Sequence, residues 1–103
     1  MRATKKYCHQ QYKKINRLVY RKRLPKRVKF RFVDPDALAD VVNGTKSGVV
    51  IRIHPRLVWC DKLVLRELIH EIAHVAHPRM AHGRRFENEM MRIKRKVYKG
   101  PVW

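Results

Sequence analysis

Apolar residues recur at helical spacing in the first part of the chain. Between positions 4 and about 22 they form one stripe, surrounded by basic residues, and they are Tyr7, Tyr12, Ile15, Leu18 and Val19. Leu24 precedes Pro25, and the residue before a proline disfavours helix. The pattern predicts a basic N-terminal helix over residues 4–22 whose stripe, tyrosines included, packs against the rest of the protein.

Two later segments predict strands, and the first of them has the alternation of a strand with one buried face. Residues 28–32 alternate apolar and basic side chains, and residues 49–53 form an apolar run that ends at His54. Residues 34–43 are ambiguous. Asp34-Pro35-Asp36 favours a short capped helix, whereas residues 39–42 would suit a strand that turns back at Asn43-Gly44 toward Ser47-Gly48. The local signals favour the helix.

The second half of the chain predicts two more helices. The first begins near Asp61, a good N-cap residue, and ends before Pro78. Its apolar surface comprises Leu63, Leu65, Leu68, Ile69, Ile72, Ala73 and Ala76. The second runs from about Gly83 to Val97, and its core-facing stripe comprises Phe86, Met90, Ile93 and Val97.

The first of these helices carries the chemistry, as His70-Glu71-Ile72-Ala73-His74. Residues four apart lie on the same face of a helix, so His70 and His74 can bind one metal ion. Glu71 lies about 100° further round, where it can act on a water at the metal rather than bind the metal. This spacing is typical of zinc hydrolases.

A catalytic zinc site takes three protein ligands and keeps the fourth position open. We expect His82 to be the third ligand, because Gly83 beside it lets the backbone turn into the next helix. His77, Glu87 and Glu89 are the alternatives, although His77 would point partly along the helix axis. Cys60 or His77 could close a purely structural site instead.

These two motifs resemble the SprT-like family of zinc metallopeptidases, which has HExxH followed by HGxxF or HGxxW. His70 to His74 match the first half, and His82-Gly83-Arg84-Arg85-Phe86 match the second. There is also a likeness to the small WLM and YgjP-type metallopeptidases. The resemblance implies that His70, His74 and His82 bind zinc and that Glu71 is the general base. It also implies a strand within residues 34–43.

The chain of 103 residues suits one domain. We expect an α+β, zincin-like fold over residues 1–103, with the N-terminal helix, a small and mostly antiparallel sheet, the metal helix and a C-terminal helix. The metal core should span about 49–97, and the strand at 49–53 should border the cleft with an edge that can take an extended substrate. Without a signal peptide or a long apolar run, we expect a protein of the cytosol, with the cytosol of a bacterium or of a phage-infected host as options, that is monomeric and makes no membrane contact. Cys8 and Cys60 should be reduced thiols.

The net charge of +18 changes the expected partners. Thirteen of the 26 lysines and arginines fall between positions 2 and 31, before the first acidic residue, Asp34. Such charge attracts polyanions and predicts contact with DNA or RNA of little sequence preference. The residues expected to make that contact are Lys5, Lys6, Lys13, Lys14, Arg17, Arg21, Lys22, Arg23, Arg92, Lys94, Arg95 and Lys96.

The sequence therefore predicts a zinc peptidase that acts on a protein or peptide substrate, in a setting near nucleic acid. His77, Tyr98 and nearby arginines are candidates to assist at the oxyanion. The alternative is a small basic protein that binds nucleic acid and uses zinc for stability alone. Glu71 favours the enzyme, because a structural zinc site has no use for a general base.

Overall fold

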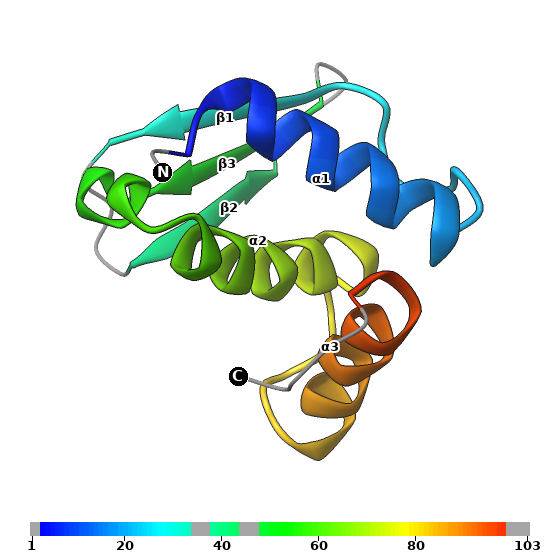
Figure 1. The fold of residues 1–103 in the computed structure, drawn as a ribbon. Helices are drawn as coiled ribbons and strands as arrows, with labels where there is room; N and C mark the ends of the chain where they lie inside the picture. Colours follow the sequence, from blue (N-terminus) through cyan, green and yellow to red (C-terminus); the bar gives the residue numbers. More distant parts are fainter. Residues whose placement is uncertain (1–2, 34–37, 44–47, 99–103) are drawn as a thin grey trace.

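Three helices and a three-stranded sheet make up the protein, which confirms the α+β class. The computed structural model describes residues 3–33, 38–43 and 48–98. The elements in chain order are α1 (Lys5–Leu18), β1 (Val28–Phe32), β2 (Ala39–Asn43), β3 (Val49–Ile53), the 3-10 turn η1 (Pro55–Trp59), α2 (Asp61–Ala76) and α3 (Arg84–Val97). Figure 1 shows α1 and α2 against the sheet and α3 beyond α2.

The sheet has the order β1-β3-β2. β3 pairs with β2 in antiparallel and with β1 in parallel, so the sheet is mixed rather than mostly antiparallel. The parallel pair arises because β3 reverses the direction of β2 and is inserted between β2 and β1 (Figure 1). The expectation that residues 49–53 form an edge strand was wrong. β3 is the central strand, and the edge next to α2 is β2.

The local preference for a helix before Asn43 was wrong over the residues that the structure describes there. Ala39 to Asn43 form β2, as the family resemblance implied. Asp40 lies opposite Arg52 of β3, and Arg52 donates to both of its carboxylate oxygens. These contacts lie far apart in sequence, so tertiary pairing overrides the local signal. Asp34, Pro35 and Asp36, like Gly44 and Ser47, lie outside the described residues.

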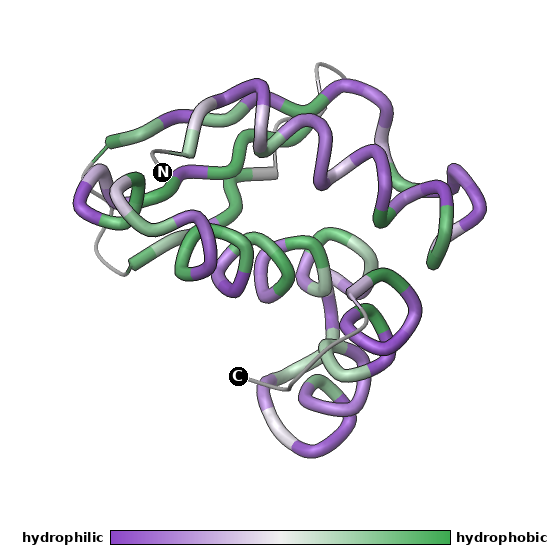
Figure 2. The backbone as a smooth tube through the Cα atoms, viewed as in Figure 1, coloured by the Kyte–Doolittle hydropathy of each residue, from purple (hydrophilic) through white to green (hydrophobic). Residues whose placement is uncertain are grey.

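One face of the sheet is buried and the other carries polar side chains. Val28, Phe30, Ile51 and Ile53 are buried, while Lys29 and Arg31 are exposed. α1 lies against β1 and α2 against β2 and β3, and the two helices also contact each other. Hydrophobic residues dominate β3 and much of α2, whereas α1 and α3 are mainly hydrophilic (Figure 2). The core thus lies between the sheet and two helices.

α1 ends at Leu18, four residues earlier than expected. Arg21 and Lys22 have positive φ angles, 50° and 66°, which a continuing right-handed helix does not allow. Asn16 stabilises the turn, because its carbonyl accepts from Lys22 N and its side chain accepts from Leu24 N. Tyr12 and Tyr20 are buried, so their rings pack inside the protein.

α3 packs on α2 and α1 rather than on the sheet. Phe86, Ile93 and Val97 are buried as the stripe predicted, and Met90 is half-buried against them. Of the helices described, none has both the length and the apolar character to cross a bilayer.

Candidate metal centre

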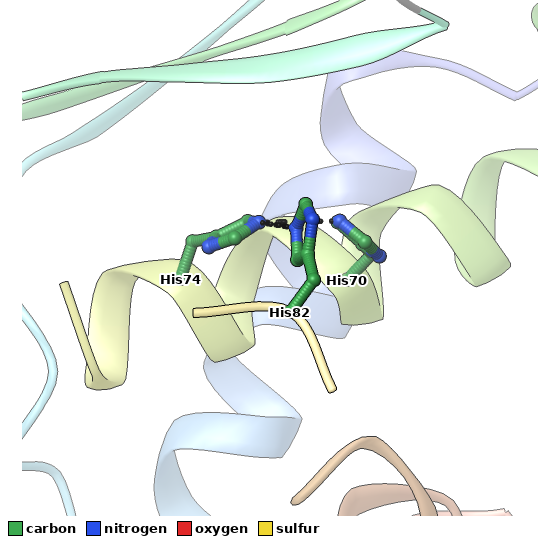
Figure 3. A group of neighbouring side chains, drawn as sticks. All are labelled: His70, His74 and His82. Carbon is green, nitrogen blue, oxygen red and sulfur yellow. Dashed lines mark hydrogen bonds between the residues drawn. The ribbon is translucent and has the colours of Figure 1, made fainter. Parts of the chain in front are cut away.

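Three histidines from α2 and the segment after it converge on one point. His70 and His74 project from adjacent turns of α2, and His82 comes from the segment before α3 (Figure 3). The Nε2 atoms of His70 and His74 are 3.2 Å apart, and those of His74 and His82 are 2.8 Å apart. Ligand atoms of all three lie within 4.8 Å of one another. We call these three residues the histidine cluster.

Gly83 enables this approach, as the sequence predicted. Its φ of 155° lies in a region that L-residues rarely adopt, and it turns the chain from His82 directly into α3. Phe86, on the first turn of α3, lies beneath the cluster and is 1% exposed. Its ring centroid is 4.9 Å from that of His70, 4.5 Å from that of His74 and 5.1 Å from that of His82. The start of α3 therefore positions both His82 and the apolar ring of Phe86 against the cluster.

The geometry of the histidine cluster fits a tetrahedral zinc ion. Zinc–nitrogen bonds of about 2.0–2.1 Å put neighbouring ligand nitrogens roughly 3.3 Å apart. The distance of 3.2 Å between His70 and His74 is close to that value, and the 2.8 Å between His74 and His82 is somewhat shorter. A neutral imidazole has one N–H and one lone pair, so three Nε2 atoms that face one another lack a full set of hydrogen bonds. A cation at their centre would accept all three lone pairs.

Burial and neighbouring charge favour the neutral form of His70 and His74. Burial, followed by the charges of His74 and His82, lowers the pKa of His70 to about 4. The same causes, burial first and then His82, lower the pKa of His74. Metal ligation requires neutral imidazole, so both rings are in the form that binds metal at neutral pH.

Glu71 lies beside the cluster in sequence and is only 3% exposed. Its Oε2 is buried and has no hydrogen-bond partner among the described residues. Burial, with smaller contributions from the charges of Glu67 and Asp40, raises its pKa to about 7. A buried carboxylate oxygen without a partner costs free energy, which a functional role would explain.

The residues considered as alternative zinc ligands either bind other side chains or lie outside the histidine cluster. His77 Nε2 contacts one carboxylate oxygen of Glu89, and Arg92 Nε donates to the other at 2.5 Å. We call His77, Glu89 and Arg92 the carboxylate network. Glu87 is exposed and does not belong to the group of convergent ligand atoms. Cys60 caps the far end of α2, roughly 20 Å from His74 along the helix.

Comparison of the chain with protein-family models, with curated proteins and with solved structures finds no match. The interpretation of the site therefore depends on its own residues and geometry.

Tyr98, His9 and His54 make their contacts outside the cluster. Tyr98 donates its hydroxyl to Gln11 of α1, which removes it from the oxyanion candidates. His9 packs edge-on against Phe30, with ring centroids 4.8 Å apart, and the His54 side chain accepts from Arg56 N.

The predicted nucleic-acid residues separate into groups. Lys13, Lys14, Arg17 and Lys22 line one hollow of about 570 Å³ on α1 and the turn that follows it. Lys5, Lys6, Arg21, Arg23, Arg95 and Lys96 are exposed. Arg92 is paired with Glu89, and Lys94 lines a different hollow together with His70.

The carboxylate network was missed from the sequence. Its Glu89–Arg92 half has the i, i+3 spacing of a helical ion pair and could have been found. The contact with His77 depends on the path of the chain between α2 and α3, which no periodicity encodes.

Proposed function

We propose that this protein is a zinc-dependent peptidase of the SprT-like kind. One observation carries the proposal: ligand atoms of three histidines lie within 4.8 Å of one another, and Glu71, which follows His70 in the chain, has a buried carboxylate oxygen without a hydrogen-bond partner among the described residues. Zinc held by His70, His74 and His82 would supply a Lewis acid and a water acidified toward neutral pH.

Glu71 is the proton carrier in this reaction. Its carboxylate accepts a proton from the attacking water and delivers it to the leaving amine of the peptide. A pKa of about 7 suits a group that must accept and return a proton at neutral pH. The buried position of Glu71 keeps other donors away from the carboxylate.

The openness of the donor set favours an enzyme over a structural zinc site. The convergent group contains three ligands among the described residues, and neither Cys60 nor His77 can serve as a fourth. His82 is exposed, so solvent and substrate can reach the cluster. The free edge of β2, next to α2, is the edge to which an extended substrate would add.

Metal content and activity test this function together. The purified protein is expected to hold one zinc per chain by mass spectrometry and to cleave unfolded proteins. Glu71→Gln should retain zinc and fold but lose cleavage by about 10²–10⁴-fold. Glu67→Gln is the matched control, because it removes a carboxylate one turn earlier on α2.

Equal cleavage by wild type and Glu71→Gln would reveal a contaminating protease or another base. Zinc-loaded wild type that cleaves none of many substrates would favour the non-catalytic alternative.

The net charge favours a setting on nucleic acid, for the enzyme and for the non-catalytic alternative alike. The hollow lined by Lys13, Lys14, Arg17 and Lys22 is a concave cationic surface of the kind that follows a phosphate backbone. If about five phosphates of duplex DNA are neutralised, log K against log salt should have a slope near −4 to −5.

Glutamine at those four positions should flatten the slope without changing zinc content. Four exposed cations elsewhere, Lys29, Arg31, Arg56 and Lys62, give the charge-matched control. Affinity that does not depend on salt would remove nucleic acid from the proposal and leave the peptidase.

A further inference from the structure

The segment that joins α2 to α3 encloses a hollow of about 720 Å³. Residues 76–85 line it, and His82 is among them, so the hollow shares a residue with the histidine cluster. We call it the arginine hollow, because Arg79, Arg84 and Arg85 all contribute to its wall.

The arginine hollow carries uncompensated positive charge. Its lining contains no carboxylate, and Arg79, Arg84 and Arg85 are exposed. Elsewhere Arg52 is paired with Asp40 and Arg92 with Glu89. None of the three hollow arginines has an acidic partner among the residues that the structure describes. An anion placed between them would relieve their mutual repulsion and could accept bidentate hydrogen bonds.

The backbone of the same wall is also accessible. A Cβ added to Gly83 would meet no atom within 4 Å, so this stretch of main chain faces open space. Gly83 makes no side-chain cap, which leaves the first amides of α3 without one. Both features add to the attraction for negative charge that the arginines create.

The other side of the cluster has a different character. A second hollow, of about 550 Å³, contains His70 and is walled partly by Ile69, Met90 and Met91, with charges of both signs at its margin. A chain that crosses the histidine cluster would therefore meet a cationic surface at His82 and a mixed, partly apolar one at His70. The parts of a substrate on the two sides of the cluster would therefore lie in surroundings of different charge.

We propose that the arginine hollow is a subsite for a substrate carboxylate, so that the enzyme prefers peptides with an acidic group next to the bond that it cleaves. This inference rests on the proposed peptidase function and names its substrate class. The carboxylate can belong to an aspartate or glutamate side chain or to the C-terminus of the peptide, and both offer the same pair of oxygens to an arginine.

Peptide binding to zinc-loaded Glu71→Gln protein tests the subsite separately from turnover. Fluorescent peptides of one length carry glutamate or glutamine at a single scanned position, each with a free or an amidated C-terminus. Fluorescence anisotropy at moderate salt should show about tenfold tighter binding of one glutamate peptide than of its glutamine partner. If only the free C-terminus confers this advantage, the carboxylate is terminal.

The variant Arg79→Gln/Arg84→Gln/Arg85→Gln should bind both peptides equally. Lys29→Gln/Arg31→Gln/Arg56→Gln loses the same charge at exposed positions outside the hollow and should keep the tenfold preference. Zinc content and thermal melting verify that each variant is folded. Should the triple variant not fold, Arg85→Gln alone should still reduce the preference.

Several results would overturn the subsite. These are equal binding of the glutamate and glutamine peptides by Glu71→Gln protein, an equal loss of preference in both triple variants, and a preference that survives in the arginine variant while DNA binding weakens. The last result would assign the hollow to nucleic-acid phosphate. A clear preference without turnover by wild type would reject the peptidase and keep the carboxylate subsite.

Discussion

Two polar clusters lie along α2, α3 and the segment between them, and their histidines have different hydrogen-bond partners. In the carboxylate network, His77 contacts the buried Glu89, whose other oxygen accepts from Arg92. In the histidine cluster, the Nε2 atoms face one another, and among the residues that the structure describes no carboxylate is hydrogen-bonded to them. The first arrangement is complete within the protein. The second brings three ligand nitrogens together without such a partner, which is why we propose it as a metal site.

We therefore call the carboxylate network a clasp between α3 and the segment before it, and we treat the histidine cluster as the proposed metal site. Burial alone would raise the pKa of Glu89, but hydrogen bonds from Arg92 and His77 lower it below its ordinary value. The clasp holds the start of the α2–α3 segment on α3, while His82 lies at the end of that segment. Each of the following changes separates the two roles.

The largest effect should come from His70→Ala or His74→Ala. Each leaves two ligands, and two ligands hold zinc poorly, so we expect affinity to fall by about 10³-fold or more. Mass spectrometry and competition with a chromophoric chelator measure this. Chelation of zinc from wild type should lower its melting temperature, because the ion binds the folded state. His54→Asn, outside the cluster, should retain zinc fully.

The second prediction compares alanine substitutions at His82 and at His77. His82→Ala should weaken zinc binding by about 100-fold or more, since loss of an outer partner alone costs 10–100-fold. His77→Ala should retain one zinc per chain, because His77 is committed to Glu89. Full zinc in His82→Ala together with its loss in His77→Ala would reverse the assignment of ligand and clasp.

The third prediction concerns Glu89→Gln, which removes the carboxylate of the clasp. Glu89 is 9% exposed, so Glu89→Gln leaves Arg92 without its buried partner. We expect a loss of about 1–3 kcal/mol in the free energy of unfolding, measured by denaturant titration. Zinc per chain should stay at one. Glu87→Gln, two residues earlier and exposed, should leave the unfolding midpoint nearly unchanged.

The smallest effect concerns pH. The pKa of Glu89 is lower in the folded state than in the unfolded chain, so its ionised form contributes stability above the unfolded pKa of about 4.5. That contribution is lost as pH falls through the folded pKa. The stability advantage of wild type over Glu89→Gln should thus be constant above about pH 4.5 and shrink below it. An advantage that grows in acid would contradict the clasp.

The histidine cluster was predictable because its parts are close in sequence. The i, i+4 spacing of His70 and His74 fixes them on one helix face, and Gly83 marks where the chain turns after His82. The strand at 28–32 and both later helices follow from periodicity, and the strand at 49–53 follows from its apolar run. Zinc binding, catalysis and nucleic-acid contact stay predictions.

What the sequence did not reveal depends on partners distant along the chain. Residues 39–43 become a strand because β3 and α2 are available to them, although Asp34-Pro35-Asp36 favoured a helix. The end of α1 depends on Asn16, whose side chain bonds to Leu24 eight residues later. The clasp between His77 and Glu89 likewise needs α3 to return along α2.

The closeness of the three histidines in the chain also bears on the order of folding. They all lie within residues 70–82, so bringing them together closes only a short loop. The entropic cost of closure grows with loop length, and short loops close in about 10–100 ns. The sheet instead needs β1 to pair with β3, and the whole of β2 lies between these two strands in the sequence. If the cluster binds zinc as we propose, metal binding can precede sheet formation, and a variant with a disrupted β1 should still bind the ion.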